Sequence, residues 1–195
     1  KKKLPSNTKK GKSFFLSGPK ALHNALFQNN TPDYSAWNKL YSADLWKDNF
    51  FSFRKFAEDL ATIPDILLNT NRIIVTTQPL YFYRKRKDSL LNTPYNKEKT
   101  ELLEIAENLL EKISTKDKRL IPAAENTLLS ASFSILWKTP DTDEFADVKK
   151  RAYKHILRLR FKSLFDTRTR FRNKAAVLFS LLGKRFLIFA LRRFG

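Results

Sequence analysis

The chain has 195 residues, 42% hydrophobic and 13% aromatic, and its 38 Lys and Arg against 19 Asp and Glu give a formal net charge of +19. This length and apolar content predict an ordinary folded domain and exclude a disordered chain. The chain has no Cys, which excludes a disulfide scaffold and a thiolate metal site. It also has no Met and starts with three Lys, so we expect it to be part of a longer protein.

The positive charge lies at the two ends of the chain. Residues 1–12 contain six Lys and no acid, and residues 150–195 contain 14 Lys and Arg and only one acid, Asp166. Residues 13–149 contain 18 charges of each sign. Such asymmetry predicts a polyanionic partner for the ends alone, either nucleic acid or an anionic membrane surface.

The first half of the chain mixes helical and strand-like patterns. In order, it predicts a helix over 20–28, a strand or tight turn over 35–41, a helical turn over 43–47, a helix over 57–69, and strands over 72–77 and 80–84. From residue 97 onward the pattern is helical throughout. It predicts helices over 97–114, 117–137, 142–165 and 168–193, with Pro140 and Gly183 as breaks.

Three segments of the first half carry groups suited to chemistry. The first places an indole, an amide and an ammonium together at Trp37, Asn38 and Lys39. An ordinary half-buried strand contains such residues. A saccharide site also needs them, because aromatic faces stack on sugar C–H surfaces while amide and ammonium groups bind hydroxyls or phosphates.

The second segment is the acidic pair Glu58 and Asp59 at a predicted helix start. Acids at this position favour the helix through its dipole, which is one interpretation. The other interpretation is a general base held at the edge of a cleft. Since adjacent helical side chains point about 100° apart, at most one of the two faces a substrate.

The third segment is the cationic run over 83–89, which includes Arg84, Arg86 and Ser89. It is either a solvated loop or a clamp for a diphosphate, to which Arg offers bidentate donors. A separate acidic pair, Asp141 and Asp143, follows Pro140. We interpret it as a helix cap and not as a metal-binding motif.

Taken in order, these three segments resemble the second half of bacterial family 2 glycosyltransferases, in the subset that builds capsular, extracellular and cell-wall polysaccharides. The resemblance rests on residues 37–41, 58–59 and 79–89 and covers about residues 14–96. It implies an α/β fold, in which residues 14–96 form the C-terminal part of a GT-A mixed sheet and an all-helical region follows.

The resemblance also implies an activity, the inverting transfer of a sugar from a nucleotide-sugar donor to a polysaccharide or lipid-linked acceptor. The residues it implies are Asp59 as general base with Glu58 beside it, Trp37, Asn38 and Lys39 as the acceptor wall, and Arg84, Arg86 and Ser89 as diphosphate contacts. A divalent metal, Mg or Mn, is implied, but its ligand motif is not in this chain. The donor-binding half is not in the sequence either, so we expect the chain by itself to be inactive.

Charge and resemblance together divide the chain into four parts: a flexible basic lead-in over 1–13, the acceptor-side part over 14–96, a helical region over 97–165 and a basic amphipathic tail over 166–195. One helix face of the tail carries an apolar stripe, made of Phe171, Ala175, Leu178, Phe179, Leu182, Phe186 and Phe189. Cations lie mostly off this stripe, a pattern typical of helices in a membrane interface. The stripe therefore predicts docking on a membrane surface, unless it packs on its own body or on a second subunit. The resemblance implies that this surface is the inner membrane face and that the protein is cytoplasmic.

Two other classes of protein fit parts of the sequence. The net charge is typical of a nucleic-acid-binding or ribosomal protein. The neutral body and the lack of a nucleic-acid motif favour a protein with no nucleic-acid partner. A non-catalytic helical interaction module is the other alternative.

Overall fold

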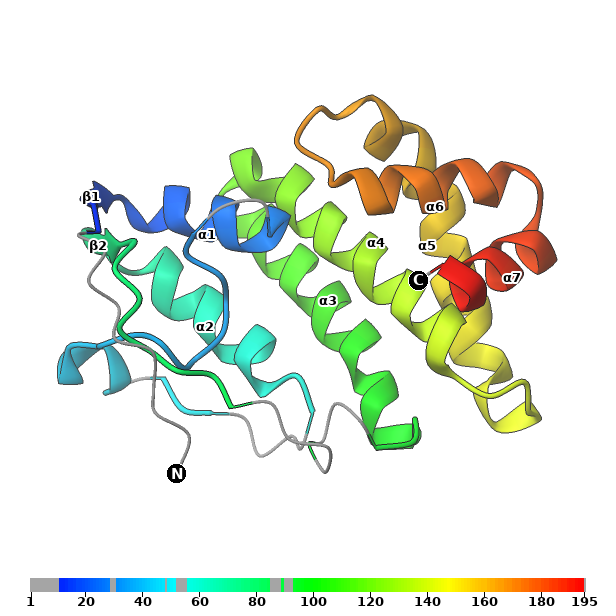
Figure 1. Ribbon diagram of the computed structural model, residues 1–195, viewed down its shortest axis with the longest axis horizontal. Helices are drawn as coiled ribbons and strands as arrows, with labels where there is room; N and C mark the ends of the chain where they lie inside the picture. The colour runs from blue at the N-terminus through cyan, green and yellow to red at the C-terminus, as the bar shows by residue number, and fades with distance from the viewer. Residues whose placement is uncertain are drawn as a thin grey trace.

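A computed structural model describes residues 11–28, 31–47, 49–51, 56–84, 89 and 93–194. It is 65% helix and 5% strand (Figure 1). The elements are β1 (Ser13–Leu16), α1 (Gly18–Phe27), η1 (Ala43–Trp46), α2 (Glu58–Leu68), β2 (Ile73–Thr76), α3 (Lys97–Lys116), η3 (Lys118–Leu120), α4 (Ile121–Lys138), η4 (Asp143–Phe145), α5 (Ala146–Phe165), α6 (Phe171–Leu181) and α7 (Lys184–Phe194).

The α/β fold with a GT-A mixed sheet over 14–96 is therefore wrong. The described residues form a single two-stranded antiparallel sheet, in which β1 pairs with β2. Residues 80–84 alternate as a strand does, but they join no sheet in the described chain. The alternation of apolar and aromatic residues has another explanation here: Tyr81 and Tyr83 both stack on Trp37 and do not face the core of a sheet.

The small sheet lies at one end of the molecule (Figure 1). Leu16 is opposite Ile73, and both pack against the buried core, while the next pair, Phe15 and Ile74, is exposed. Ser13, which we expected in the flexible lead-in, begins β1. Lys residues in the rest of that lead-in, over 1–10, lie outside the described residues.

The helices predicted from residue 97 onward are confirmed, with shifted ends. Helix α3 begins where predicted because the Asn96 side chain accepts a hydrogen bond from the Lys99 backbone N–H at 3.2 Å, a standard N-cap. The helix predicted over 168–193 is divided in two. Gly183 separates α6 from α7 with φ at +98°, a value that glycine adopts without strain.

Helix α4 is the centre of the packing. It contacts α1, α3, α5, α6 and α7, and Figure 1 shows α3 and α4 running side by side, with α2 on the other side of α3. Two buried clusters surround it. The first joins α1, α2, α3 and the start of α4, with Leu22 and Ile63 fully buried, and the second joins α3 to α7, with Leu129 and Ile156 fully buried.

A buried polar network joins α1, α4 and α6. The Asn126 Nδ2 group donates to the Leu26 carbonyl at 3.1 Å, and the Thr127 hydroxyl donates to the same carbonyl at 3.1 Å. Asn173 Nδ2 donates to Asn126 Oδ1 at 3.2 Å and to Ser130 Oγ at 2.8 Å. Because the side chains of all these polar residues meet one another, α6 is attached to the same body as α1.

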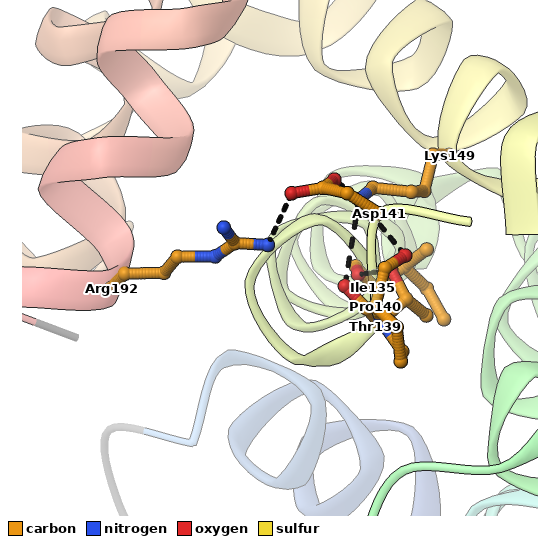
Figure 2. A network of polar contacts seen from close by, with 6 residues as sticks. All are labelled: Ile135, Thr139, Pro140, Asp141, Lys149 and Arg192. Carbon is orange, nitrogen blue, oxygen red and sulfur yellow. Dashed lines mark hydrogen bonds and ion pairs between the residues drawn. The ribbon is translucent and has the colours of Figure 1, made fainter.

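A second network holds the connection between α4 and α5 (Figure 2). The Lys149 side chain is 6% exposed, pairs with Asp141 and donates to the Pro140 carbonyl at 3.3 Å. Arg192 of α7 donates to the other oxygen of Asp141 at 2.9 Å. Hydrogen bonds from Lys149 and then Arg192 hold the pKa of Asp141 below its usual value. Asp141 is thus an ion-pair centre and not the cap we expected, since Thr142 occupies the cap position of η4.

Candidate functional site

The acidic pair lies at the start of α2, as the sequence predicts. Ala57, directly before the helix, has φ at +58°, and Glu58 and Asp59 form the first turn. Both acids are half-buried. The first turn of α2 lies beside the 33–41 turn, because the Asp59 carboxylate accepts a hydrogen bond from the Ala36 backbone N–H.

Burial raises the pKa of the Asp59 carboxyl, and this is the largest influence on it. A hydrogen bond from the Ala36 backbone N–H acts in the opposite direction, as does the ammonium of Lys39, while the carboxylates of Glu58 and Asp33 raise the pKa further. Asp59 forms no salt bridge within 4 Å in the described part of the chain. It is therefore a carboxylate with one fixed N–H donor and an increased affinity for a proton.

The 33–41 turn that faces Asp59 is fixed by its own hydrogen bonds. Asp33 accepts from the Ser35 N–H at 3.1 Å, which forms an Asx turn. Asn38 lies in the left-handed region with φ at +61°, and the Tyr41 hydroxyl donates to the Ala36 carbonyl at 3.1 Å. These contacts hold Ala36, and with it the N–H that binds Asp59, in place.

Lys39 is a clamp for this turn. Its Nζ donates to Asp33 at 3.0 Å, to the Ser35 carbonyl at 2.6 Å and to the Asn38 side chain at 3.0 Å. An ammonium has three N–H donors, and all three are used within the turn. Contact of Lys39 with an acceptor stays a prediction, but the structure gives it a positioning role.

Aromatic side chains form the exposed surface next to the turn. The Trp37 ring stacks on Tyr81 and Tyr83, with centroid distances of 5.2 Å and 4.7 Å. The three side chains remain 37%, 52% and 49% exposed. Residues 37 and 81–83 are distant in sequence, so the structure brings together two of the three segments that carry the resemblance.

Two phenols lie close to Asp59 as well. Burial, followed by the charges of Asp59 and Asp33, raises the pKa of Tyr41 to about 12. Burial and the charge of Asp33 also raise the pKa of Tyr34, whose hydroxyl accepts a hydrogen bond from Gln28 at 2.8 Å. Gln28 in turn binds Arg170, directly before α6. Both phenols are therefore neutral hydrogen-bonding groups at any physiological pH.

The cationic part of the third segment is less closely connected. Arg84 is exposed and follows Tyr83 directly, and Ser89 is partly buried. Arg86 lies outside the described residues. No hydrogen bond or ion pair joins Arg84 or Ser89 to Asp59 in the part of the chain that is described, so their diphosphate contact stays a prediction.

The described residues do not form a site for the implied metal, since no group of three or more His, Asp or Glu side chains among them is arranged to hold an ion. Asp33 and Glu58 both act on the charge of Asp59, but the Lys39 ammonium is bound to Asp33 and acts on Asp59 as well. We therefore derive no catalytic step through a metal.

The sequence does not indicate the roles of Asp33 and Tyr34 in the turn. One signal exists for Asp33, because Asp two positions before Ser, after Pro, is typical of an Asx turn. Tyr41, Tyr81 and Tyr83 belong to the segments that carry the resemblance, but their contacts with Ala36 and Trp37 are not predicted from the sequence. No signal in the sequence links Gln28 to Arg170, since this contact depends on how α1 and α6 pack.

Comparison with other proteins adds nothing to this picture, since no protein-family model, curated protein or solved structure matches the chain.

Proposed function

We propose that the chain is the acceptor-side part of an inverting glycosyltransferase, with Asp59 as its general base. The resemblance of residues 37–41, 58–59 and 79–89 motivates this proposal. One structural observation supports it most: a half-buried carboxylate, with no ion-pair partner among the described residues, accepts a hydrogen bond from the Ala36 N–H of the turn whose Trp37 stacks on residues 81 and 83.

In the proposed reaction, Asp59 takes the proton from an acceptor hydroxyl while that oxygen attacks the anomeric carbon of the nucleotide sugar. The bond from that carbon to the nucleoside diphosphate breaks, and its electron pair leaves with the diphosphate. A raised pKa makes Asp59 a stronger base than an ordinary Asp. The Ala36 N–H binds the carboxylate and orients it, so little reorganisation is needed when the proton moves.

The neighbouring groups have separate tasks in this proposal. The exposed faces of Trp37, Tyr81 and Tyr83 hold the acceptor sugar by stacking on its C–H surface. Lys39 keeps the turn in shape through its three hydrogen bonds. Arg84 follows Tyr83 directly, so its positive charge lies at the end of the aromatic segment. The other predicted diphosphate contacts come next in the sequence.

The test is the turnover of the Asp59→Asn variant in the full-length protein that contains this chain. Released nucleoside diphosphate is measured over a panel of nucleotide sugars and acceptors. Asn retains an oxygen that can accept from Ala36 but cannot take a proton at neutral pH. We expect kcat to fall by at least about 10²-fold, the scale of losing a general base.

Asp65→Asn is the matched control, since Asp65 is on the same helix and makes the same change of charge. Its carboxylate binds Lys112 at 2.6 Å and takes no part in the proposed site. Thermal unfolding of both variants establishes that each is folded. If Asp59→Asn retains the turnover of Asp65→Asn, Asp59 is a structural residue and the proposal is wrong.

A further inference from the structure

The outward faces of α6 and α7 form an exposed apolar surface. Its members are the large side chains that the two helices turn away from the body: Phe171, Leu178, Leu181, Leu182, Phe186 and Phe189. We call these six residues the outer surface. Phe171 is 86% exposed, Leu182 67% and Phe189 62%, which is far above the exposure of residues packed in a core.

The opposite faces of the two helices are buried in the body. Val177 of α6 and Leu187 of α7 are fully buried in the second core, and Leu191 is nearly so. The ion pair between Arg192 and Asp141 attaches the end of α7 to the α4–α5 connection (Figure 2). The apolar stripe of the tail is thus divided: Phe179 packs against the body, while the outer surface does not.

Ring contacts join the outer surface to the body. Phe179, which packs against the second core, contacts Phe186 across the Gly183 break, with ring centroids 5.9 Å apart, and Phe186 contacts Phe189 at 6.4 Å. Because α6 and α7 already pack on the second core, binding does not carry the entropic cost of ordering these helices.

The helices that carry the outer surface have exposed cations and no acid. Arg172, Lys184 and Arg185 are exposed on these two helices. Arg172 also lies over the Trp137 ring and Lys184 over the Tyr153 ring, at 5.6 Å and 5.8 Å from the centroids. The one acid over residues 150–195, Asp166, is bound by Arg168 through two hydrogen bonds of 2.9 Å and 2.8 Å. A partner of this surface must therefore combine negative charge with an apolar layer.

We infer that the outer surface docks on a lipid bilayer that carries anionic headgroups. Phe and Leu side chains enter the boundary between headgroups and acyl chains, and the neighbouring cations bind the headgroups. The helices lie on the bilayer and do not cross it, because no helix in the described chain combines enough length and apolarity to span a membrane. The inference is independent of the proposed catalytic role, since it uses none of the same residues.

Co-sedimentation with vesicles tests this inference. The probes are vesicles made of equal parts phosphatidylglycerol and phosphatidylcholine, and vesicles of phosphatidylcholine alone. We expect the full chain to bind the anionic vesicles, to bind the neutral ones far more weakly, and to be released as salt is raised. Equal binding to both kinds, or binding to neither, would overturn the inference.

Two triple variants identify the surface. Replacing Arg172, Lys184 and Arg185 by Gln removes three cations and should weaken binding to anionic vesicles by about 10²-fold. Replacing Phe171, Leu182 and Phe189 by Ser keeps the charge and should also weaken it, because these side chains are exposed and their loss leaves the fold intact. The matched control replaces Lys20, Lys97 and Lys118, all exposed elsewhere, by Gln.

The control variant should bind anionic vesicles nearly as tightly as the unmodified chain does. This result would show that binding depends on the cations of α6 and α7 and not only on the net charge of the protein. Equal loss in the control would overturn the assignment to α6 and α7. Two further outcomes would also overturn it: a duplex-DNA shift at physiological salt without vesicle binding, or a dimer in light scattering that the Ser variant abolishes without any vesicle binding.

Discussion

The buried network around Asn126 gives the sharpest prediction about the fold. Changing Asn126 to Ala removes its bond to the Leu26 carbonyl and its bond from Asn173. Each hydrogen bond contributes about 0.5–1.5 kcal/mol net, so the variant should lose about 1–3 kcal/mol of unfolding free energy. The loss stays in this range because Thr127 still donates to Leu26 and Ser130 still accepts from Asn173.

A double-mutant cycle isolates the contact between the two amides. Asn173→Ala alone should cost about as much, since it also removes two hydrogen bonds. The double variant should cost less than the sum by about 0.5–1.5 kcal/mol, because the shared bond is counted twice in that sum. Urea unfolding followed by circular dichroism measures all four free energies.

A second cycle, which pairs Asn96 with Asn126, provides the control. Asn96 caps the N-terminus of α3, which is far from the first turns of α4. Asn96→Ala should cost about 1 kcal/mol and combine additively with Asn126→Ala. If the Asn126 and Asn173 losses are also additive within about 0.5 kcal/mol, the amides do not bond, and the account of how α6 is attached is refuted.

Three further variants test other parts of the structure. Gly18→Ala would place a methyl group against the Leu67 carbonyl of α2, so it should lower the unfolding free energy by about 1–3 kcal/mol or more; a fully stable variant contradicts this close approach. Lys149→Met leaves buried carbonyls without a donor and should cost about 1–3 kcal/mol in urea unfolding, whereas the exposed neighbour Lys150→Met should change it by less than about 0.5 kcal/mol. In the full-length protein, Trp37→Ala should raise the KM for the acceptor by about 2–10-fold and leave the KM for the donor unchanged, since only a stacking contact is lost; an equal rise in both would contradict the acceptor role.

The helical half of the fold could be predicted from sequence because its signals are local. Apolar spacing identified the helices after residue 97, and Gly183 marked the last break. The end at Pro140 was equally clear. The polar contacts between helices, such as Asn126 with Asn173, could not be predicted because they join residues whose distance depends on packing alone.

The sheet was predicted wrongly for a physical reason. Alternation of apolar and aromatic residues over 80–84 indicates that every second side chain faces the same way, and it does not indicate what lies there. Here Tyr81 and Tyr83 pack on the indole ring of Trp37 and not on a neighbouring strand. A strand also needs a hydrogen-bonded neighbour; residues 73–76 have one, in β1, and residues 80–84 have none among the described residues.

The candidate site was predicted in part. The residue types around Asp59 and Trp37 could be selected from sequence, because indole, amide and carboxylate groups in this order resemble a known pattern. The sequence does not predict that Lys39 donates its hydrogen bonds within its own turn, because these bonds depend on the positions of Asp33 and Ser35. The chemical groups of the segments could therefore be predicted from the sequence, whereas the proximity of the segments is known only from the structure.

The dependence of kcat/KM on pH tests the central claim most directly. Burial raises the folded pKa of Asp59, so the carboxylate is protonated, and inactive as a base, at a higher pH than an ordinary Asp. The account predicts that activity of the full-length protein falls on the acidic side with an apparent pKa above 3.8, the usual value for Asp, and that the Asp59 carboxyl titrates with the same pKa in carbon NMR. An acidic limb that persists unchanged in Asp59→Asn, or that does not coincide with the titration of Asp59, would contradict it.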